Sequence, residues 1–234
     1  MMPRYLLIIL TAVLVLNVQA GELPPAFKAH YVVKKGPFEL GNAVRELQYG
    51  SDGELVFSTG SDTTGLAELL YSDHIRETTR LKQGNTGVMP LEYRYERNGK
   101  RNRTMSQQFD WEQGSVTSRI DEVVYEYPFP RDVVDQSAYQ VSLMVDLAKG
   151  GREFNYPVAG KKAMRTYEIQ HVGDERIKTV LGELNTVVIQ RKTKRKTTMW
   201  CAYDLHFLPV KIQHEEKGST FTAYLESVEG LQQP

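Results

Sequence analysis

Leu91-Glu92-Tyr93-Arg94-Tyr95-Glu96-Arg97, followed by Asn98-Gly99, is the stretch that decides the fold class. Apolar or aromatic residues alternate with charged residues along it, and Asn-Gly is a strong signal for a tight hairpin turn. A period of two residues places alternate side chains on opposite faces of a strand. The stretch therefore predicts a β-strand with Tyr93 and Tyr95 on one face, ending in a hairpin.

The same pattern continues along most of the chain. Phe27 to Val33 and Glu54 to Thr59 are also rich in Tyr, Val, Phe and Thr, and Gly- and Asn-containing turn signals recur at hairpin distances. We count about eleven such segments, which is more than a flat sheet usually carries. The sequence predicts an all-β fold: an antiparallel meander in sequential order that curls into a barrel, a half-barrel or two packed layers.

One segment has a different period. Ser137 stands three residues before Gln140, as in a capping box, and apolar residues then follow at helical spacing until Gly150-Gly151. We expect one amphipathic helix near residues 138–149. Its apolar face is broad and must be covered, so the helix should pack on the concave face of the curled sheet.

The first twenty residues are typical of a cleaved signal peptide. Arg4 supplies the positive charge, Leu6 to Leu16 form a short apolar core, and Val18-Gln19-Ala20 offers small residues for cleavage. The apolar run is short for a membrane span, and no cysteine follows the cleavage site to carry a lipid anchor. We therefore expect residues 1–20 to be removed and residues 21–234 to form a single β-rich domain in the periplasm.

Composition limits the partners and the chemistry. Lys and Arg total 29 and Asp and Glu also total 29, and a chain without a basic excess is a poor candidate for binding nucleic acid. The single cysteine, Cys201, can form no internal disulfide. Because Trp200 and Ala202 beside it are typical of a core, we expect Cys201 to be buried.

A basic run separates two further predicted strands, Leu184 to Arg191 and Thr197 to Ala202. Two interpretations of this hairpin tip stay open. It can be a solvated turn whose charges discourage pairing with other chains, neutralised by acidic neighbours such as Glu215 and Glu216. Alternatively, it can contact anionic lipid headgroups. The residues concerned are Arg191, Lys192, Lys194, Arg195 and Lys196.

Several motifs in a fixed order resemble one known family. They are Asp135-Gln136-Ser137 before the helix, Thr179-Val180-Leu181-Gly182-Glu183-Leu184-Asn185-Thr186, Thr198-Met199-Trp200 and Leu208-Pro209-Val210-Lys211-Ile212. Together they are similar to the domain-of-unknown-function family 3108, exported proteins of Gram-negative bacteria. The resemblance implies a periplasmic setting and a β-rich fold, and it implies no catalytic activity. The last hairpin is also similar to those of periplasmic lipoprotein carriers, which are unclosed barrels capped by helices.

No catalytic, metal or cofactor site is predicted. His214-Glu215-Glu216-Lys217 lacks the second histidine of a zinc-binding H-E-x-x-H motif, and no G-x-S-x-G elbow or glycine-rich phosphate loop occurs. Cys201 and His206 could be a nucleophile and a base. However, apolar neighbours disfavour a thiolate, which is the wrong direction for reactivity.

Aromatic residues are the better candidates for a binding site. Tyr125 and Tyr127 alternate along one predicted strand, as Tyr93 and Tyr95 do along another, so each pair projects from one face. With Trp111 and Trp200 they could line an apolar groove that holds a ligand. The alternative is that these six side chains fill the core together with the helix.

These features lead to three functional hypotheses. The first is a non-enzymatic periplasmic binding or envelope-assembly protein that holds an acyl chain or a lipidated partner in an apolar groove. The second is a structural interaction protein with a filled core, which docks to another envelope protein through a sheet edge. The third, a hydrolase with a site assembled from distant residues, has the least support.

Overall fold

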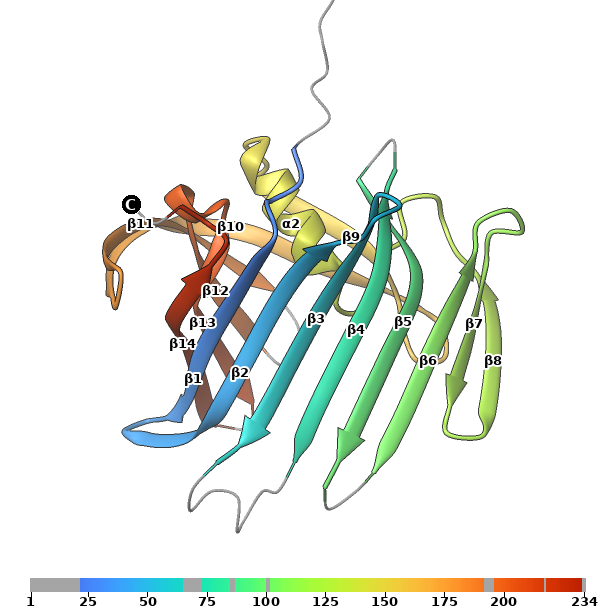
Figure 1. The fold of residues 1–234 in the computed structure, drawn as a ribbon, viewed down its shortest axis with the longest axis horizontal. Coiled ribbons are helices and arrows are strands. Elements are labelled where there is room, and N and C mark those ends of the chain that lie inside the picture. Colours follow the sequence, from blue (N-terminus) through green and yellow to red (C-terminus); the bar gives the residue numbers. More distant parts are fainter. Residues whose placement is uncertain are drawn as a thin grey trace, which may run out of the picture.

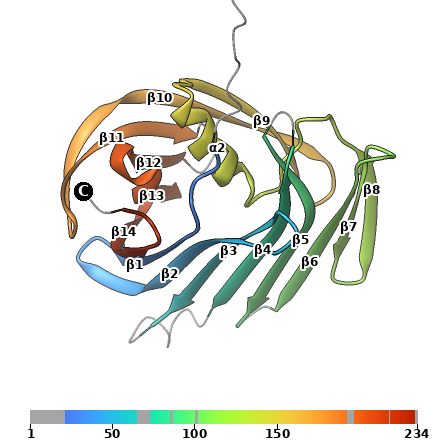
Figure 2. The same cartoon turned by 45° about the horizontal axis from the view of Figure 1, so that its top comes forward.

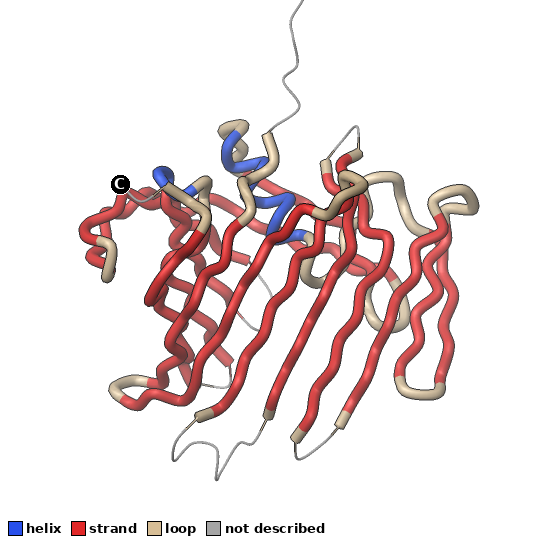
Figure 3. The backbone as a smooth tube through the Cα atoms, in the orientation of Figure 1, coloured by secondary structure: helices blue, strands red, loops and turns tan. Residues whose placement is uncertain are grey.

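The computed structural model describes residues 22–64, 73–84, 87–99, 102–191, 196–216 and 218–232. Within these ranges the chain forms one sheet of fourteen antiparallel strands that curls into a barrel (Figure 1). The tube in Figure 3 is dominated by strands, with little helix. The all-β prediction is confirmed, although the sheet has three more strands than the approximate count from the sequence.

The strand bounds follow the chain in order. The strands are β1 (Phe27–Lys35), β2 (Phe38–Tyr49), β3 (Glu54–Thr63), β4 (His74–Gln83), β5 (Val88–Asn98), β6 (Arg103–Asp110), β7 (Ser115–Ile120), β8 (Val123–Pro128), β9 (Glu153–Ala159), β10 (Met164–Thr179), β11 (Gly182–Arg191), β12 (Lys196–Ala202), β13 (Leu208–Glu216) and β14 (Ser219–Glu229). Some turns lack the usual sequence signal. Asp121, between β7 and β8, takes a φ of 51° that glycine commonly supplies, so the sequence does not mark this turn.

The sheet consists of two meanders joined by their first and last strands. Its order is β8-β7-β6-β5-β4-β3-β2-β1-β14-β13-β12-β11-β10-β9. The expected sequential order therefore holds within each meander. Strands β1 and β14 pair antiparallel along their length, from Lys28↔Glu229 to Lys34↔Thr222. This long-range pairing brings the two ends of the domain together and makes the curled wall continuous.

A single α-helix among the described residues, α2 (Tyr139–Ala148), lies inside the curve of the sheet (Figure 2). Seven of its ten residues are buried, and five of these, including Val141, Leu143 and Leu147, belong to the main hydrophobic core. The predicted helix and its packing on the concave face are confirmed. No helix in the described part of the chain has the length and apolar character needed to cross a membrane.

The predicted capping box is wrong. Ala138 already has helical φ and ψ angles, and the Ser137 hydroxyl is buried without a hydrogen-bond partner. Asp135 does the capping instead, because its Oδ1 accepts hydrogen bonds from the backbone N–H groups of Ser137 and Ala138 at 2.7 and 2.8 Å.

The barrel closes between its two edges without a ladder between β8 and β9. Val134 makes a parallel bridge to Val158 on β9, with the Val134 N–H 2.9 Å from the Pro157 carbonyl oxygen. Inward-facing side chains of the other meander then bind the chain just after β9. Gln107 Nε2 donates to the Gly160 carbonyl at 2.8 Å, and Ser118 Oγ donates to the Lys161 carbonyl at 2.8 Å. Side-chain donors thus satisfy the carbonyls at this seam.

Candidate functional site

Five of the six aromatic residues predicted to line a groove lie together on the inner face of β5 to β8 and the adjoining turn. Tyr93, Tyr95, Trp111 and Tyr127 belong to a second hydrophobic core, together with Ala159 and Met164 on either side of the turn between β9 and β10. Tyr93 is 1% exposed, and Trp111 Nε1 donates to the Pro90 carbonyl at 2.8 Å. Tyr127 donates to the Gly160 carbonyl. Lys161 and Lys162 lie over the rings of Tyr95 and Tyr125.

The structure does not bring Trp200 to this group. On β12, Trp200 points to the opposite face from its neighbour Cys201, as alternation along a strand requires. Its Nε1 donates to Glu175 Oε2 at 2.6 Å, and Lys211 Nζ lies 3.9 Å from the ring centroid. Trp200 therefore packs under charged side chains of β10 and β13.

The basic run is only partly described. Lys192, Lys194 and Arg195 lie outside the described residues. Lys196 begins β12 and forms an ion pair with Glu215 at 3.4 Å, which is the acidic neutralisation expected from the sequence. Arg191 ends β11, and its guanidinium lies 4.3 Å from the centroid of Tyr167 and 5.8 Å from that of Tyr139 on α2.

A pocket of about 360 Å³ lies at the mouth of the barrel, at the end of β1 to β4 away from α2. Apolar side chains from β1, β2, β4 and β14 meet there, and mainly polar residues form the rest of its lining. The lining residues are Val33, Lys35, Leu40, Gly41, Asn42, Ser61, Asp62, Thr63, Asp73, Ile75 and Phe221. We call this the mouth pocket.

Gly41 shapes the mouth pocket. A Cβ at this position would lie 2.0 Å from the Asp62 carbonyl oxygen, because the end of β3 crosses directly over it. The Thr64 N–H also donates to the Leu40 carbonyl at 3.0 Å. Only glycine permits this close approach of the two strands, and the approach sets the curvature of the wall at the mouth.

Deeper in the barrel the inner face becomes polar. Arg45, Thr59, Glu77 and Tyr95 form one cross-strand row over β2 to β5. All four are partly exposed although they face inward. Thr59 Oγ1 donates to Glu77 Oε2 at 3.4 Å. Inward side chains that keep contact with solvent indicate a wet interior above the mouth pocket.

Two carboxyl groups of the interior have raised pKa values. Burial raises the pKa of Glu77, against the opposing effects of hydrogen bonds from Tyr93 and Thr59 and the positive charges of Arg45 and Lys161. Burial also raises the pKa of Asp135 to about 7, against hydrogen bonds from Ala138, Ser137 and Thr79. The interior therefore carries less negative charge at neutral pH than its carboxyl count indicates.

Two arginines of the interior, Arg45 and Arg191, have no carboxylate partner among the described residues. Arg45 acts on the pKa of Glu77, and Arg191 and Arg165 act on the pKa of Tyr167. Among the described residues, neither Arg45 nor Arg191 makes an ion pair, and Arg191 Nε is buried without a hydrogen-bond partner. The basic run in the sequence marked Arg191 as a candidate anion contact at a hairpin tip, whereas no sequence motif marks Arg45 on β2.

Cys201 is fully buried, as predicted. Burial raises the pKa of its thiol to about 12, so the thiolate needed for nucleophilic chemistry is not formed at neutral pH. Within the described ranges, no three His, Cys, Asp or Glu side chains are grouped so that they could hold a metal ion.

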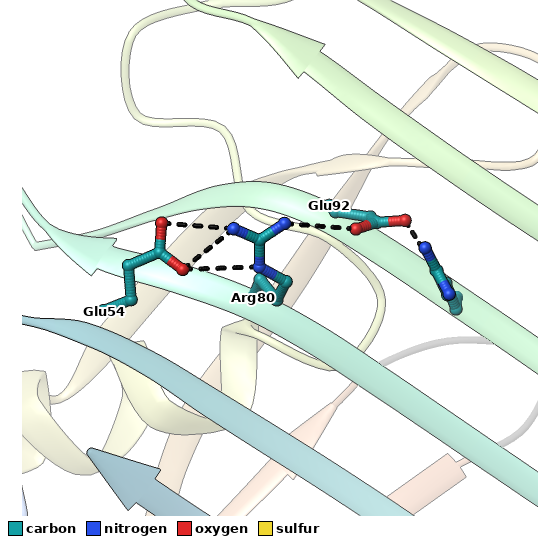
Figure 4. A network of polar contacts seen from close by, with 4 residues as sticks. Glu54, Arg80 and Glu92 are labelled. Carbon is teal, nitrogen blue, oxygen red and sulfur yellow. Dashed lines mark hydrogen bonds and ion pairs between the residues drawn. The ribbon is translucent and has the colours of Figure 1, made fainter. Parts of the chain in front are cut away.

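Two other surface features are less suited to a ligand of this kind. On the outer face, Arg80 bridges Glu54 at 2.9 Å and Glu92 at 3.5 Å (Figure 4), so these charges already have partners. A larger pocket of about 460 Å³ lies between α2 and β9. Its lining has apolar residues such as Val145 and Phe154, but it also includes Asp132, Asp146 and Glu153, which repel an anion.

Comparisons with known proteins support the fold and assign no activity. The profile of the family described as Protein of unknown function (DUF3108) matches residues 27–226. A crystal structure of a β-barrel-like protein of domain of unknown function DUF1849 from Brucella abortus is similar in fold, with a TM-score of 0.59 and 7% sequence identity, covering 89% of this chain and 98% of that one. No curated protein matches.

Proposed function

Because the chain belongs to the family described as Protein of unknown function (DUF3108), which confirms the resemblance in its motifs, we propose a function from the site itself. The protein is a non-enzymatic periplasmic binding protein that holds an acyl chain, free or attached to a lipidated partner, at the mouth of its barrel. The observation that carries this proposal is the mouth pocket, with Val33, Leu40, Ile75 and Phe221 in its lining.

The size and lining of the mouth pocket suit an acyl chain. Its volume of about 360 Å³ lies within the range of small-molecule sites. Each methylene group buried there contributes about 0.8 kcal/mol, so burial of about six methylenes stabilises the complex by several kcal/mol. The pocket is open at the end of the barrel, which lets a longer chain or an attached partner remain outside.

The sequence supports export and contact with a membrane surface. Residues 1–20 have the features of a cleaved signal peptide, which supports the proposed periplasmic setting. In this proposal the rest of the basic run, Lys192, Lys194, Arg195 and Lys196, contacts anionic headgroups while the pocket takes up or releases its ligand, each charge contributing about 1 kcal/mol. Arg191 is not part of this contact, because its guanidinium packs over Tyr167 inside the barrel. Neutralising Lys194, Arg195 and Lys196 should then weaken binding to anionic vesicles and leave binding of a soluble acyl probe intact.

A titration with dodecanol, a neutral twelve-carbon probe, tests the acyl-binding function. The purified mature protein should bind dodecanol, and Ile75→Glu should weaken binding at least tenfold by placing a charge in the pocket. Val172→Glu is the matched control, since Val172 is 46% exposed and is not part of the pocket lining. Absence of dodecanol binding, or equal binding by both variants, contradicts the proposal.

The alternative is the structural interaction protein with a filled core. The part of the interior around α2 favours it, because Val141 and Leu143 are packed in the core and at most 2% exposed. That function needs no ligand. A protein that binds no acyl probe but is recovered with another envelope protein after cross-linking in the periplasm would support this second function.

A further inference from the structure

We infer that Arg45 and Arg191 bind the anionic head of the ligand inside the barrel, with the acyl chain directed toward the mouth pocket. The ligand class is then a single-chain amphiphile with a carboxylate or phosphate head. This inference rests on the proposed acyl-binding function, and it adds the chemical class of the ligand and its orientation.

The position of Arg45 supports this orientation. Gly41, Ala43 and Arg45 follow one another on the inner face of β2, and Gly41 lines the mouth pocket. At about 3.3 Å per residue, Arg45 lies about 13 Å deeper along the strand than Gly41. An extended acyl chain of about ten carbons spans a similar length, so one ligand can reach both the pocket and the guanidinium.

Arg191 is connected to the pocket through the opposite part of the wall. The paired residues Arg191↔Thr197, Thr197↔His214 and His214↔Phe221 form a continuous inner row from β11 to β14. Phe221 at the end of this row lines the mouth pocket. Neighbouring strands lie about 4.8 Å apart, so Arg191 is about 14 Å from Phe221 along the wall.

The surroundings of the two arginines leave their donors available. Arg191 packs over the ring of Tyr167 at 4.3 Å, and Arg45 packs over the ring of Tyr31 at 5.6 Å. Aromatic faces hold a guanidinium plane without using its N–H donors. Because Arg191 Nε is buried and makes no hydrogen bond, an anion that accepts from it would remove an existing energetic cost.

The sign of the charge selects an anion over a cation. Glu77 faces inward with partial exposure, and burial raises its pKa. The two carboxylates in the lining of the mouth pocket, Asp62 and Asp73, already have Arg76 and Arg97 as partners. Lys161 and Arg165 add to the positive potential of Arg45 and Arg191 on the same interior groups. A planar carboxylate or a phosphate matches the paired donors of a guanidinium, whereas an ammonium head would be repelled.

Calorimetric titration of the full mature protein with dodecanoate, dodecyl phosphate and dodecanol tests this inference. Arg191→Met, which keeps the length of the side chain but removes its charge, should weaken binding of dodecanoate at least tenfold and leave dodecanol unchanged. Arg45→Met should behave in the same way. Arg119→Met is the control, because Arg119 is exposed and lies next to the inward Ser118 on β7.

The outcomes separate this inference from the proposed function. Equal loss of dodecanoate and dodecanol binding, or no loss of either, overturns the anion site, while dodecanol binding by the wild type still supports the acyl pocket. A wild type that binds none of the probes overturns both. Tighter binding of dodecyl phosphate than of dodecanoate identifies a phosphate head, and the reverse identifies a carboxylate.

If the arginine variants do not fold, the wild-type protein alone decides. It must then bind dodecanoate at least tenfold more tightly than dodecanol, and the difference must shrink as salt concentration rises. Equal affinities for the charged and neutral probes overturn the inference.

Discussion

The two halves of the barrel interior are occupied in different ways. Around α2, the inward side chains of the strands meet Val141, Leu143 and Leu147, all at most 3% exposed. Toward the mouth, the inward side chains include Arg45, Glu77 and Arg191 and remain partly exposed. The interior of a curled sheet of this length must be occupied. In this chain α2 occupies only one half of it.

The lengths of the elements explain the difference. A ten-residue helix is about 15 Å long, whereas strands of nine to twelve residues reach about 30 to 40 Å. The helix therefore cannot line the whole interior. The half beyond it either takes up solvent or takes up a ligand, and its mixture of apolar and cationic residues favours an amphiphilic ligand.

The largest expected effect is the pH dependence of stability that comes from Asp135, which is buried beside α2. The pKa of Asp135 is about 7 in the folded protein and near 3.8 when unfolded, so the folded state keeps a proton that the unfolded state has lost between these values. Stability should therefore fall as pH rises from 4 to 7, by on the order of 4 kcal/mol from this group, and then level off.

Asp135→Asn isolates this effect, since asparagine keeps an oxygen that can accept the N–H groups of Ser137 and Ala138. Urea unfolding at several pH values should show a shallower fall in stability between pH 4 and 7 for the variant than for the wild type. Identical pH profiles of the two proteins would show that Asp135 is ionised in the folded state at low pH and would contradict its placement in a dry interior.

The next largest effect tests whether the filled half is the stable half. Leu143→Ala removes a side chain that is 2% exposed in the core around α2, and it should lower the free energy of unfolding by about 3 kcal/mol. Ile75→Ala at the mouth pocket should cost clearly less, because Ile75 is only partly buried. Similar losses in the free energy of unfolding for the two variants, measured by urea unfolding, would contradict the difference in packing between the two halves.

A moderate effect is expected at the seam that closes the barrel. Gln107→Ala removes hydrogen bonds to the Ala159 and Gly160 carbonyls, and we expect a loss of about 2 kcal/mol. Gln108→Ala is the matched control on the exposed side of β6 and should stay close to the wild type. Hydrogen exchange should also rise in the chain from Ala159 to Met164; unchanged exchange there would argue against the seam.

The smallest effect is expected on the outer face. Arg80→Ala removes the bridge between Glu54 and Glu92 (Figure 4), but Arg80 and Glu54 are solvated and the buried Glu92 keeps its ion pair with Arg94. The melting temperature and acyl binding should match those of the wild type. A clear loss of acyl binding would show that the outer face takes part in function and would break the assignment of the site to the interior.

The local pattern of the sequence was sufficient for the fold class and the helix. Alternation in stretches such as Leu91 to Arg97 predicted the strands, and the change of period after Ser137 predicted α2 almost to the residue. The cap was wrong because Asp135 accepts the N–H groups of Ser137 and Ala138, while the Gln140 N–H donates to the Ser137 carbonyl and not to its hydroxyl. The resemblance to the family was confirmed over residues 27–226.

The candidate site needed the three-dimensional structure. Arg45 and Arg191 face one interior only because β1 pairs with β14, a contact between the ends of the domain that no local signal predicts. The sequence predicted aromatic residues on the faces of the strands, but it did not predict that Trp200 lies apart from the other five. Alternation along β12 already separates Trp200 from Cys201, yet the sequence does not say which of the two faces inward.

Native mass spectrometry of the mature protein, purified under gentle conditions from its own periplasm, tests the central claim most directly. We predict a protein that carries an additional mass, which extraction identifies as a single-chain amphiphile with a carboxylate or phosphate head. The same measurement on Ile75→Glu should give the mass of the polypeptide alone. A wild-type protein that appears only as bare polypeptide, and that gains no mass on addition of dodecanoate, would contradict the claim that the mouth of the barrel holds an acyl ligand.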